Sequence, residues 1–281
     1  MTQTRPREPK HIAILPGQHI RPRRSLGQNF LRDENISRKI VASVAAAASD
    51  IVLEIGPGEG ALTRYLARTV NRLIAVDIDE RVVSRMRAEL PAIELIQGDF
   101  LQVDLAGIAH RHGSPLRVVG NIPYNITTPI LFHILDSRTS VRDATLMVQR
   151  EVAQRLVARP GSKEYGILSV SFQVFAEVKP LFTVARAAFY PRPDVMSSVV
   201  RLVFLPAPRY SIVDEQLFRT MVRAIFGKRR KMLRTSLKYF CDEHGYHLPG
   251  GVDLTRRPED LDIRELVDLS NALVATSSRA R

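Results

Sequence analysis

The sequence has little cysteine, no tryptophan and no long apolar run. Its one cysteine, Cys241, excludes a disulfide within the chain and suits a reducing compartment. No stretch approaches the roughly 18 consecutive apolar residues that indicate a transmembrane helix. The Arg- and Pro-rich residues 1–25 lack the apolar core of a secretory signal. With 45% hydrophobic and 25% charged residues, we expect a globular protein of the cytoplasm without a membrane partner.

Acidic residues are also scarce relative to basic ones. The chain has 29 Asp and Glu against 41 Lys and Arg, a formal net charge of +12. Residues 1–32 contain seven basic residues and one acidic residue, and residues 207–281 contain fourteen and ten. The region between them is therefore nearly neutral. A positive excess gathered at the two ends indicates a polyanionic partner such as nucleic acid.

The apolar segments predict an α/β fold. Asp33 can cap a helix that continues to Val44, with apolar residues at helical spacing. Short apolar runs, with helical segments between the earlier ones, follow at residues 51–55, 73–76, 93–96, 116–119, 145–148, 170–175 and 198–204. This alternation predicts a mostly parallel, Rossmann-like sheet with helices on both faces.

A change of pattern near residue 207 predicts a second domain. Pro206 and Pro208 interrupt the last strand, and amphipathic helical patterns follow at residues 217–226, 231–240 and 263–274. We therefore expect three parts: a basic, disordered arm over 1–24, a catalytic α/β domain over 25–207, and a small all-helical domain over 208–281.

A glycine-rich loop, Glu54-Ile55-Gly56-Pro57-Gly58-Glu59-Gly60, lies between the first strand and the next helical segment. Glycines let the backbone turn sharply and approach a ligand closely. Asp77 follows the next strand and can accept hydrogen bonds from ribose hydroxyls. Asp99 follows the third and suits an adenine amino group. Each aspartate could instead be a helix cap, and the loop itself fits either NAD or S-adenosylmethionine.

A second motif, Gly120-Asn121-Ile122-Pro123-Tyr124, follows the fourth strand and favours methyl transfer to an adenine amino group. The N6 lone pair is delocalised into the ring, so acceptors on the amino hydrogens would favour a tetrahedral, nucleophilic nitrogen. The side-chain oxygen of Asn121 and the carbonyl of Ile122 can supply these acceptors. Pro123 stiffens the turn, and Tyr124 offers a face on which an extruded base can stack. The motif alone could be an ordinary β-turn.

With these motifs in place, the chain resembles the KsgA family of ribosomal RNA adenine dimethyltransferases. The segments that carry the resemblance are residues 25–31, the glycine loop, the Asn121–Tyr124 turn, and residues 149–153, 162–166 and 189–193. The resemblance implies S-adenosylmethionine-dependent dimethylation of N6 on two adjacent adenines near the 3′ end of small-subunit (16S) rRNA, within an assembly intermediate.

The resemblance also implies roles for particular residues. It places Gln28, Asn29 and Leu31, with Glu54, Gly56, Gly58, Asp77, Asp99 and Asn121, around the cofactor. It implies that Phe189 closes over the target adenine opposite Tyr124. Two features depart from the family pattern, because most relatives carry Glu at the position of Asp77 and the arm is longer than the family needs.

The basic residues of the predicted second domain gather in one segment. Lys228, Arg229, Arg230, Lys231 and Arg234 alternate with apolar residues, which predicts an amphipathic helix with a basic face that contacts RNA. Cys241, His244 and His247 lie nearby, but a structural zinc site needs a fourth ligand, so no metal is expected.

Several alternatives remain open at this point. A large-subunit rRNA adenine methyltransferase of the antibiotic-resistance type shares the Asn121–Tyr124 turn. A non-catalytic ribosome assembly factor could be built on the same scaffold, although an intact turn and glycine loop argue against it. A dehydrogenase leaves the turn unexplained. The protein is expected to act as a monomer.

Overall fold

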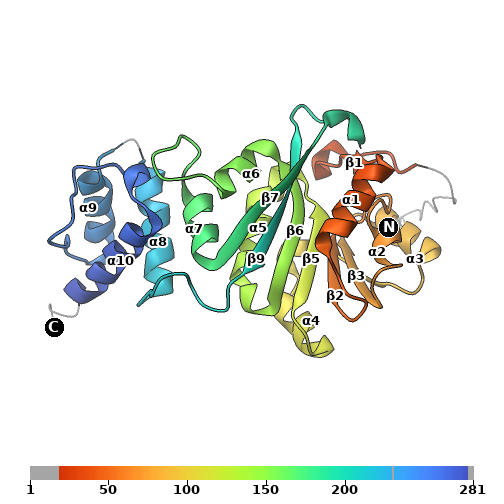
Figure 1. Ribbon diagram of the computed structural model, residues 1–281, viewed down its shortest axis with the longest axis horizontal. Helices are drawn as coiled ribbons and strands as arrows, with labels where there is room; N and C mark the ends of the chain where they lie inside the picture. Colours follow the sequence, from red (N-terminus) through yellow and green to blue (C-terminus); the bar gives the residue numbers. More distant parts are fainter. Residues whose placement is uncertain (1–18, 230, 278–281) are drawn as a thin grey trace, which may run out of the picture.

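The computed structural model describes residues 19–229 and 231–277, which form a mixed β-sheet flanked by helices and a helical region at one end (Figure 1). The sheet has seven strands, in the spatial order β4 (Glu94–Gln97), β3 (Arg72–Asp77), β2 (Ile51–Ile55), β5 (Leu116–Asn121), β6 (Val141–Gln149), β9 (Ser197–Phe204) and β7 (Ala176–Val184). The pairs from β4 to β6 are parallel, and β9 is antiparallel to both of its neighbours. The strand order reverses between β2 and β5, which is where open α/β sheets bind ligands.

Helices cover both faces of the sheet because the strands are apolar on both sides. In β2, Leu53 belongs to one buried cluster together with α4 and α5, and its neighbour Val52 belongs to a second cluster together with α1 and α2. The helices that surround the sheet are α1 (Glu34–Val44), α2 (Thr63–Leu66), α3 (Glu80–Glu89), α4 (Leu105–His112), α5 (Thr127–Asp136), α6 (Arg150–Leu156) and α7 (Ile167–Phe175). The Asp33 cap is confirmed, because its carboxylate accepts hydrogen bonds from the backbone N–H groups of Asn35 and Ile36.

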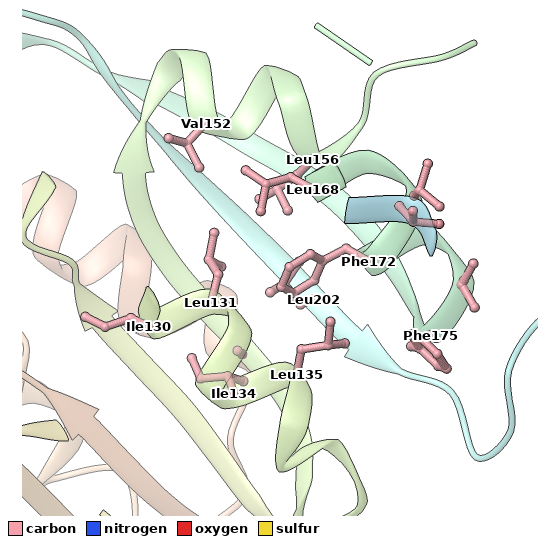
Figure 2. Close-up of a cluster of buried hydrophobic side chains, with 14 of the residues drawn as sticks. Ile130, Leu131, Ile134, Leu135, Val152, Leu156, Leu168, Phe172, Phe175 and Leu202 are labelled. Atoms are coloured by element: carbon pink, nitrogen blue, oxygen red, sulfur yellow. The ribbon is translucent and has the colours of Figure 1, made fainter. Parts of the chain in front are cut away.

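The prediction of a strand at residues 170–175 is wrong. These residues form the end of α7, which is buried on nearly every side, and Phe172 and Phe175 pack against α5 and β9 (Figure 2). A helix that is apolar all round has no polar face, so its sequence cannot be told from a buried strand. The strand β7 follows instead and was not predicted, because it is a half-exposed edge strand with Pro180 beside a bulge.

The helical region comprises α8 (Glu215–Gly227), α9 (Leu233–His244) and α10 (Ile263–Ser277). The three predicted helices are present, and they lie at the end of the molecule beyond α7 (Figure 1). The hydrophobic cluster of the sheet continues into them, and the rings of Tyr165 and Phe226 meet edge to face at 5.8 Å across the junction. No helix within the described ranges is long and apolar enough to cross a membrane.

Part of the predicted arm is folded against α3 and the glycine loop. Ile20 is buried among side chains of α3, its backbone N–H donates to Glu59 at 2.8 Å, and His19 contacts the same carboxylate. The prediction of disorder up to residue 24 is therefore wrong for residues 19–24, because a buried acceptor on the glycine loop holds this segment. Residues 1–18 lie outside the described part of the chain.

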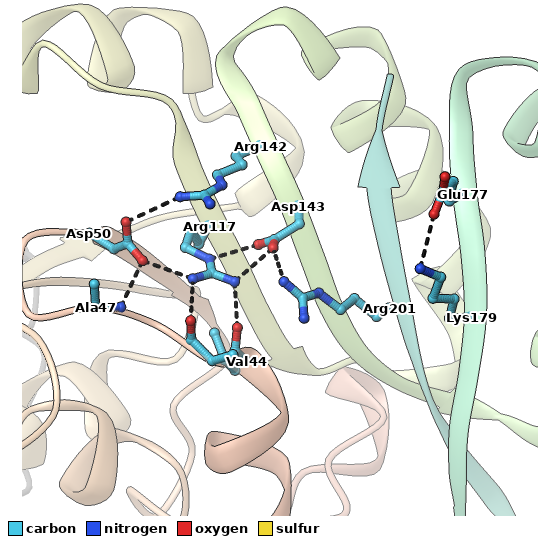
Figure 3. Close-up of polar contacts among 10 residues, drawn as sticks. Val44, Ala47, Asp50, Arg117, Arg142, Asp143, Glu177, Lys179 and Arg201 are labelled. Atoms are coloured by element: carbon cyan, nitrogen blue, oxygen red, sulfur yellow. Dashed lines mark hydrogen bonds and ion pairs between the residues drawn. The ribbon is translucent and has the colours of Figure 1, made fainter. Parts of the chain in front are cut away.

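A buried ionic network lies at the amino-terminal edge of the sheet (Figure 3). Arg117 of β5 is 2% exposed and donates to both carboxylate oxygens of Asp143 on β6, to Asp50 before β2, and to the carbonyls of Val44 and Ala45 at the end of α1. All five donor hydrogens of the guanidinium are thereby used. The hydrogen bond from Arg117 is the main cause that holds the pKa of Asp50 below its usual value.

Candidate active site

A cavity of about 260 Å³ opens at the carboxyl-terminal edge of the sheet, beside β2, β3 and β5. Its lining residues come from segments that are distant in sequence: 25–30, Ile55, Gly56, Gly58, 76–78, 98–101, 121–126 and Ile130. The switch point between β2 and β5 therefore brings the two motifs found in the sequence into one site.

The glycine loop keeps the floor of this cavity open. Gly56 and Gly58 have positive φ angles of 65° and 55°, which few other residues adopt. A Cβ atom at Gly56 or Gly98 would meet no atom within 4 Å, so both backbones face open space. Gly58 is different, because a Cβ there would lie 2.9 Å from the ring of Phe30. The loop thus offers bare backbone to a ligand, as the sequence predicted.

Asp77 and Asp99 both reach the cavity and both also organise the backbone. Asp77 accepts the N–H of Asp79 at 2.8 Å, and Asp99 caps the short helix η2 (Phe100–Gln102) through the N–H of Leu101. Burial raises the pKa of Asp77 to about 6, against hydrogen bonds from backbone N–H groups that lower it. The carboxylate therefore lacks solvent and has capacity left for donors from a ligand.

The Asn121–Tyr124 turn forms the opposite wall. The side-chain nitrogen of Asn121 donates to the carbonyl of Asn29 at 2.8 Å, which leaves its side-chain oxygen available as an acceptor. Ile122 is held by a bond from its N–H to the carbonyl of Met147 at 3.0 Å. The hydroxyl of Tyr124 contacts that of Ser197 at 2.5 Å, and burial raises the pKa of the tyrosine. The turn is thus fixed from both sides, with its acceptors beside the cavity.

The segment before α1 closes the cavity, and two acidic residues missed by sequence reasoning hold it there. Gln28 lines the cavity, but its amide already bonds the carboxylate of Asp79 and the N–H of Arg23. Asp79 is 2% exposed and caps α3, and Glu59 holds residues 19 and 20. The sequence signals that could have revealed them are the position of Asp79, two residues after Asp77, and that of Glu59, inside the glycine loop.

Three predicted site residues do not line the cavity. Leu31 and Phe189 are cross-strand partners in the small ladder of β1 (Phe30–Leu31) and β8 (Phe189–Tyr190), and both are buried in the core. Glu54 is 1% exposed within β2, and one of its carboxylate oxygens has no hydrogen-bond partner among the described residues. Burial raises the pKa of Glu54 to about 8, with the charge of Asp77 acting in the same direction.

The prediction that the basic residues 228–231 belong to a helix is wrong. Residues 228–232 connect α8 to α9, and α9 begins only at Leu233. Arg229 is engaged within the protein, since it bonds the carboxylate of Glu259 at 2.9 Å and the carbonyl of Lys163 at 3.0 Å. Lys228, Lys231 and Arg234 are exposed, and Arg230 lies outside the described residues.

Within residues 19–229 and 231–277, no three His, Cys, Asp or Glu side chains are arranged to hold a metal ion. Cys241 is buried in α9, and burial raises the pKa of its thiol to about 11. The ring of His244 stacks on Phe240 at 4.4 Å. Both residues are therefore part of the packing of the helical region.

The fold and this site define the class of protein. A glycine loop, two carboxylates on neighbouring strand ends and a reversed strand at one side of the sheet are the features of class I methyltransferases, whose cofactor is S-adenosylmethionine. The open backbone at Gly56 and Gly98 and the carboxylates of Asp77 and Asp99 at the cavity fit that cofactor. The chain belongs to the ribosomal RNA adenine dimethylase family, whose model matches residues 20–274.

Individual relatives agree with this assignment. The chain is 47% identical over 255 residues to ribosomal RNA small subunit methyltransferase A of Chlorobaculum tepidum, covering 91% of this chain and 90% of the relative. It is 43% identical to the protein of the same name from Geobacter sulfurreducens, covering 93% and 98%.

Solved structures show the same fold. A dimethyladenosine transferase from Plasmodium falciparum superposes with a TM-score of 0.69 at 26% identity, covering 89% of this chain and 98% of that one. The 23S rRNA methyltransferase ErmE superposes with a TM-score of 0.60 at 29% identity, covering 88% and 100%. The chain is thus an rRNA adenine dimethyltransferase, as its motifs indicated.

Proposed function

We propose that this enzyme dimethylates N6 of two adjacent adenines near the 3′ end of small-subunit rRNA. The support is the name shared by relatives 43–47% identical over about nine-tenths of the chain. The large-subunit enzyme ErmE is a more distant match at 29% identity. The observation that carries the chemistry is the side-chain oxygen of Asn121, left free as an acceptor at the cavity that also contains the glycine loop.

In this proposal the glycine loop and the N-terminal segment would hold the cofactor. Asp77 would accept hydrogen bonds from its ribose, and Asp99 would accept one from its adenine amino group. Ile78, which lines the cavity and is 56% exposed, would pack on the adenine ring. S-adenosylmethionine supplies an electrophilic methyl group. The side chain of Gln28 is already bonded within the protein, whereas that of Asn29 lines the cavity with no donor to its oxygen among the described residues, so Asn29 would be the one of the two to contact the cofactor through its side chain.

The target adenine stacks on Tyr124 with its amino group toward Asn121. The side-chain oxygen of Asn121 and the carbonyl of Ile122 accept the two amino hydrogens, which turns the nitrogen lone pair out of the ring plane. Each methyl addition leaves a positively charged nitrogen on an aromatic ring, and this nitrogen is acidic enough to release a proton to water. The bond between Tyr124 and Ser197 keeps the stacking ring in place. Phe189, expected to close over the adenine opposite Tyr124, is buried at 5% exposure beside this site and stays a prediction.

The test is to incubate the protein with labelled S-adenosylmethionine and undermethylated small ribosomal subunits, and to map the modified nucleotides. We expect dimethyladenosine at two adjacent positions near the 3′ end. Methylation of large-subunit rRNA instead would establish the antibiotic-resistance type of activity. Binding of the subunit without methyl transfer would indicate an assembly factor.

We further propose that residues 25–207 bind the cofactor and that residues 208–281 bind rRNA through Lys228, Lys231 and Arg234. These three side chains are exposed in and beside the connection between α8 and α9. Replacing all three by Ala should weaken subunit binding and reduce the slope of its logarithmic salt dependence by roughly 0.7 to 0.9 for each phosphate that is no longer bound. The control is Arg229→Ala, whose guanidinium is already bonded to Glu259. Parallel salt plots for the triple variant and the wild type would contradict this assignment.

We also propose that the enzyme acts as a monomer in the cytoplasm. Light scattering of the purified protein tests the oligomeric state.

We propose that its substrate is a subunit that is still being assembled, because the two adenines must be free to leave their stacks. Comparing assembly intermediates with mature subunits as substrates tests this.

A further inference from the structure

One surface segment, residues 190–196, combines exposed apolar side chains with a direct connection to the active site. Tyr190, Val195 and Met196 are 50%, 43% and 38% exposed. Exposed apolar groups gathered on one short segment indicate a binding surface, whereas single ones do not. Neither the chemistry of the target adenine nor the packing of the core accounts for this segment.

Both ends of the segment are anchored on the walls of the cavity. Tyr190 is the cross-strand partner of Phe30, a cavity-lining residue, so their Cα atoms lie about 5 Å apart. At the other end, the hydroxyl of Ser197 bonds that of Tyr124. The segment therefore forms the rim of the site between the N-terminal segment and the target-base turn.

Tyr190 carries a stacked cation. The guanidinium of Arg32 lies over its ring, 4.2 Å from the centroid, and the backbone N–H of Arg32 donates to the carbonyl of Ala188 at 2.8 Å. The side chain of Tyr190 is still half exposed, so a planar aromatic and guanidinium pair faces solvent beside the cavity. Arg192 and Arg150 on the same rim are also exposed.

Resting on the proposed function, we propose that Tyr190 and Arg32 form a shelf that holds the nucleotide next to the target adenine. The base of that nucleotide stacks on the tyrosine ring, and its phosphate lies against the guanidinium. Such a shelf suits single-stranded RNA, because every base has a face that can stack and every linkage carries a charge. The shelf fixes the register of the RNA strand relative to the cavity, and so decides which of the two adjacent adenines enters it.

The test compares full-length variants at Tyr190 on undermethylated small subunits. Tyr190→Phe keeps the ring, Tyr190→Leu keeps apolar bulk without a plane, and Tyr190→Ala removes both. We expect the Phe variant to match the wild type. The Leu and Ala variants should raise KM for subunits roughly 5- to 100-fold with kcat little changed, and should alter the ratio of methylation at the two adenines. Val213→Ala, at another exposed apolar residue, which lies before α8, serves as the matched control.

A second measurement separates this proposal from the proposed function. Affinity for a short single-stranded RNA containing adjacent adenines, followed by fluorescence anisotropy, should fall for Tyr190→Ala and Arg32→Gln but not for Tyr190→Phe. If the wild type transfers no methyl group to small subunits while this pattern holds, the function is wrong and the shelf stands. If Tyr190→Leu or Tyr190→Ala equals the wild type in both assays, no base stacks there and the shelf is overturned. If Tyr190→Phe fails as Tyr190→Ala does, the hydroxyl rather than the ring acts, which also overturns the shelf.

Discussion

The two ends of the strands in the central sheet both bury ionisable side chains, but these side chains differ in their hydrogen-bond partners and in the direction of their pKa shifts. At the amino-terminal edge, Arg117 has a partner for every donor, and the bonds from Arg117 keep the pKa of Asp50 low. At the carboxyl-terminal edge, burial raises the pKa of Asp77 to about 6 and that of Glu54 to about 8, and one oxygen of Glu54 has no partner within the described chain. The guanidinium of Arg117 is thus fully paired within the protein, whereas Asp77 lines the cavity as a desolvated carboxylate that a ligand can reach.

This difference follows from the topology of a parallel sheet. The connections that follow β2 and β5 leave toward opposite faces of the sheet at the switch point, so the polar side chains at these strand ends face a cavity. The amino ends of β5 and β6 lie beside the end of α1, whose backbone carbonyls accept from Arg117. Substitutions at the two edges should therefore affect different measurements.

The largest effect is expected at the amino-terminal edge. Arg117→Met leaves the buried Asp143 and the half-buried Asp50 without their main partner, which should lower the free energy of unfolding by about 3–5 kcal/mol. Urea denaturation measures this change. The matched control is Arg142→Met, because Arg142 is 63% exposed at the side chain and meets Asp50 at only 3.5 Å. Its loss should be below about 1 kcal/mol. Equal losses for the two variants would show that the network is not the main stabilising element.

At the carboxyl-terminal edge, Asn121→Ala should reduce methyl transfer by roughly 100- to 1000-fold, because one preorganised acceptor for the target amino group is lost. Single-turnover transfer on enzyme saturated with cofactor and subunit measures the step. Subunit affinity should change little, since phosphate contacts dominate it. Transfer near the wild-type rate would contradict the proposed polarisation of the amino group.

Asp77→Ala should weaken S-adenosylmethionine binding by about 1.5–3 kcal/mol, since the ribose hydroxyls lose a charged acceptor. Calorimetry with the cofactor and the isolated protein gives the dissociation constant. The same change in Asp99→Ala should be smaller, because that residue faces one amino group instead of two hydroxyls. An unchanged constant for Asp77→Ala would mean that another carboxylate holds the ribose.

The pH dependence of cofactor binding should report the same carboxylate. Burial raises the pKa of Asp77 to about 6 in the free protein, and hydroxyl donors favour the charged form. Affinity should therefore be constant above pH 6 and fall by up to about tenfold for each pH unit below it. Asp77→Asn should remove this decrease. A decrease that persists in the variant would assign it to another group.

The last effect is a stability change at Glu54 that appears only at high pH. Its pKa is raised from 4.5 to about 8, so the folded protein holds a proton that the unfolded chain releases, and stability falls as pH rises between these values. Glu54→Gln should therefore be more stable than the wild type at pH 9, with the difference shrinking toward pH 5. Thermal unfolding at several pH values measures this. A difference independent of pH would show that Glu54 is not protonated in the folded protein.

Much of the site could be predicted from local sequence. The glycine loop, Asp77, Asp99 and the Asn121–Tyr124 turn each follow a recognisable strand, and parallel strands bring their ends to one edge. Leu31 and Phe189 were expected there through family resemblance, but their pairing across β1 and β8 turns both into the core. Arg229 lies in a basic run typical of RNA contact, yet Glu259, thirty residues later, engages it.

The sequence by itself determined the α/β order of the elements, the two motifs and the family, because strand and helix periods and turn residues are local properties of the chain. Only the tertiary structure decided that residues 170–175 are a helix, that residues 19–24 lie against α3 and the glycine loop, and which charged side chains are paired within the protein. The physical reason is that burial and pairing depend on neighbours distant in sequence. A buried apolar run becomes a helix or a strand according to the elements that pack against it. An arginine such as Arg229 is available to RNA only to the extent that no carboxylate of the folded protein pairs with it.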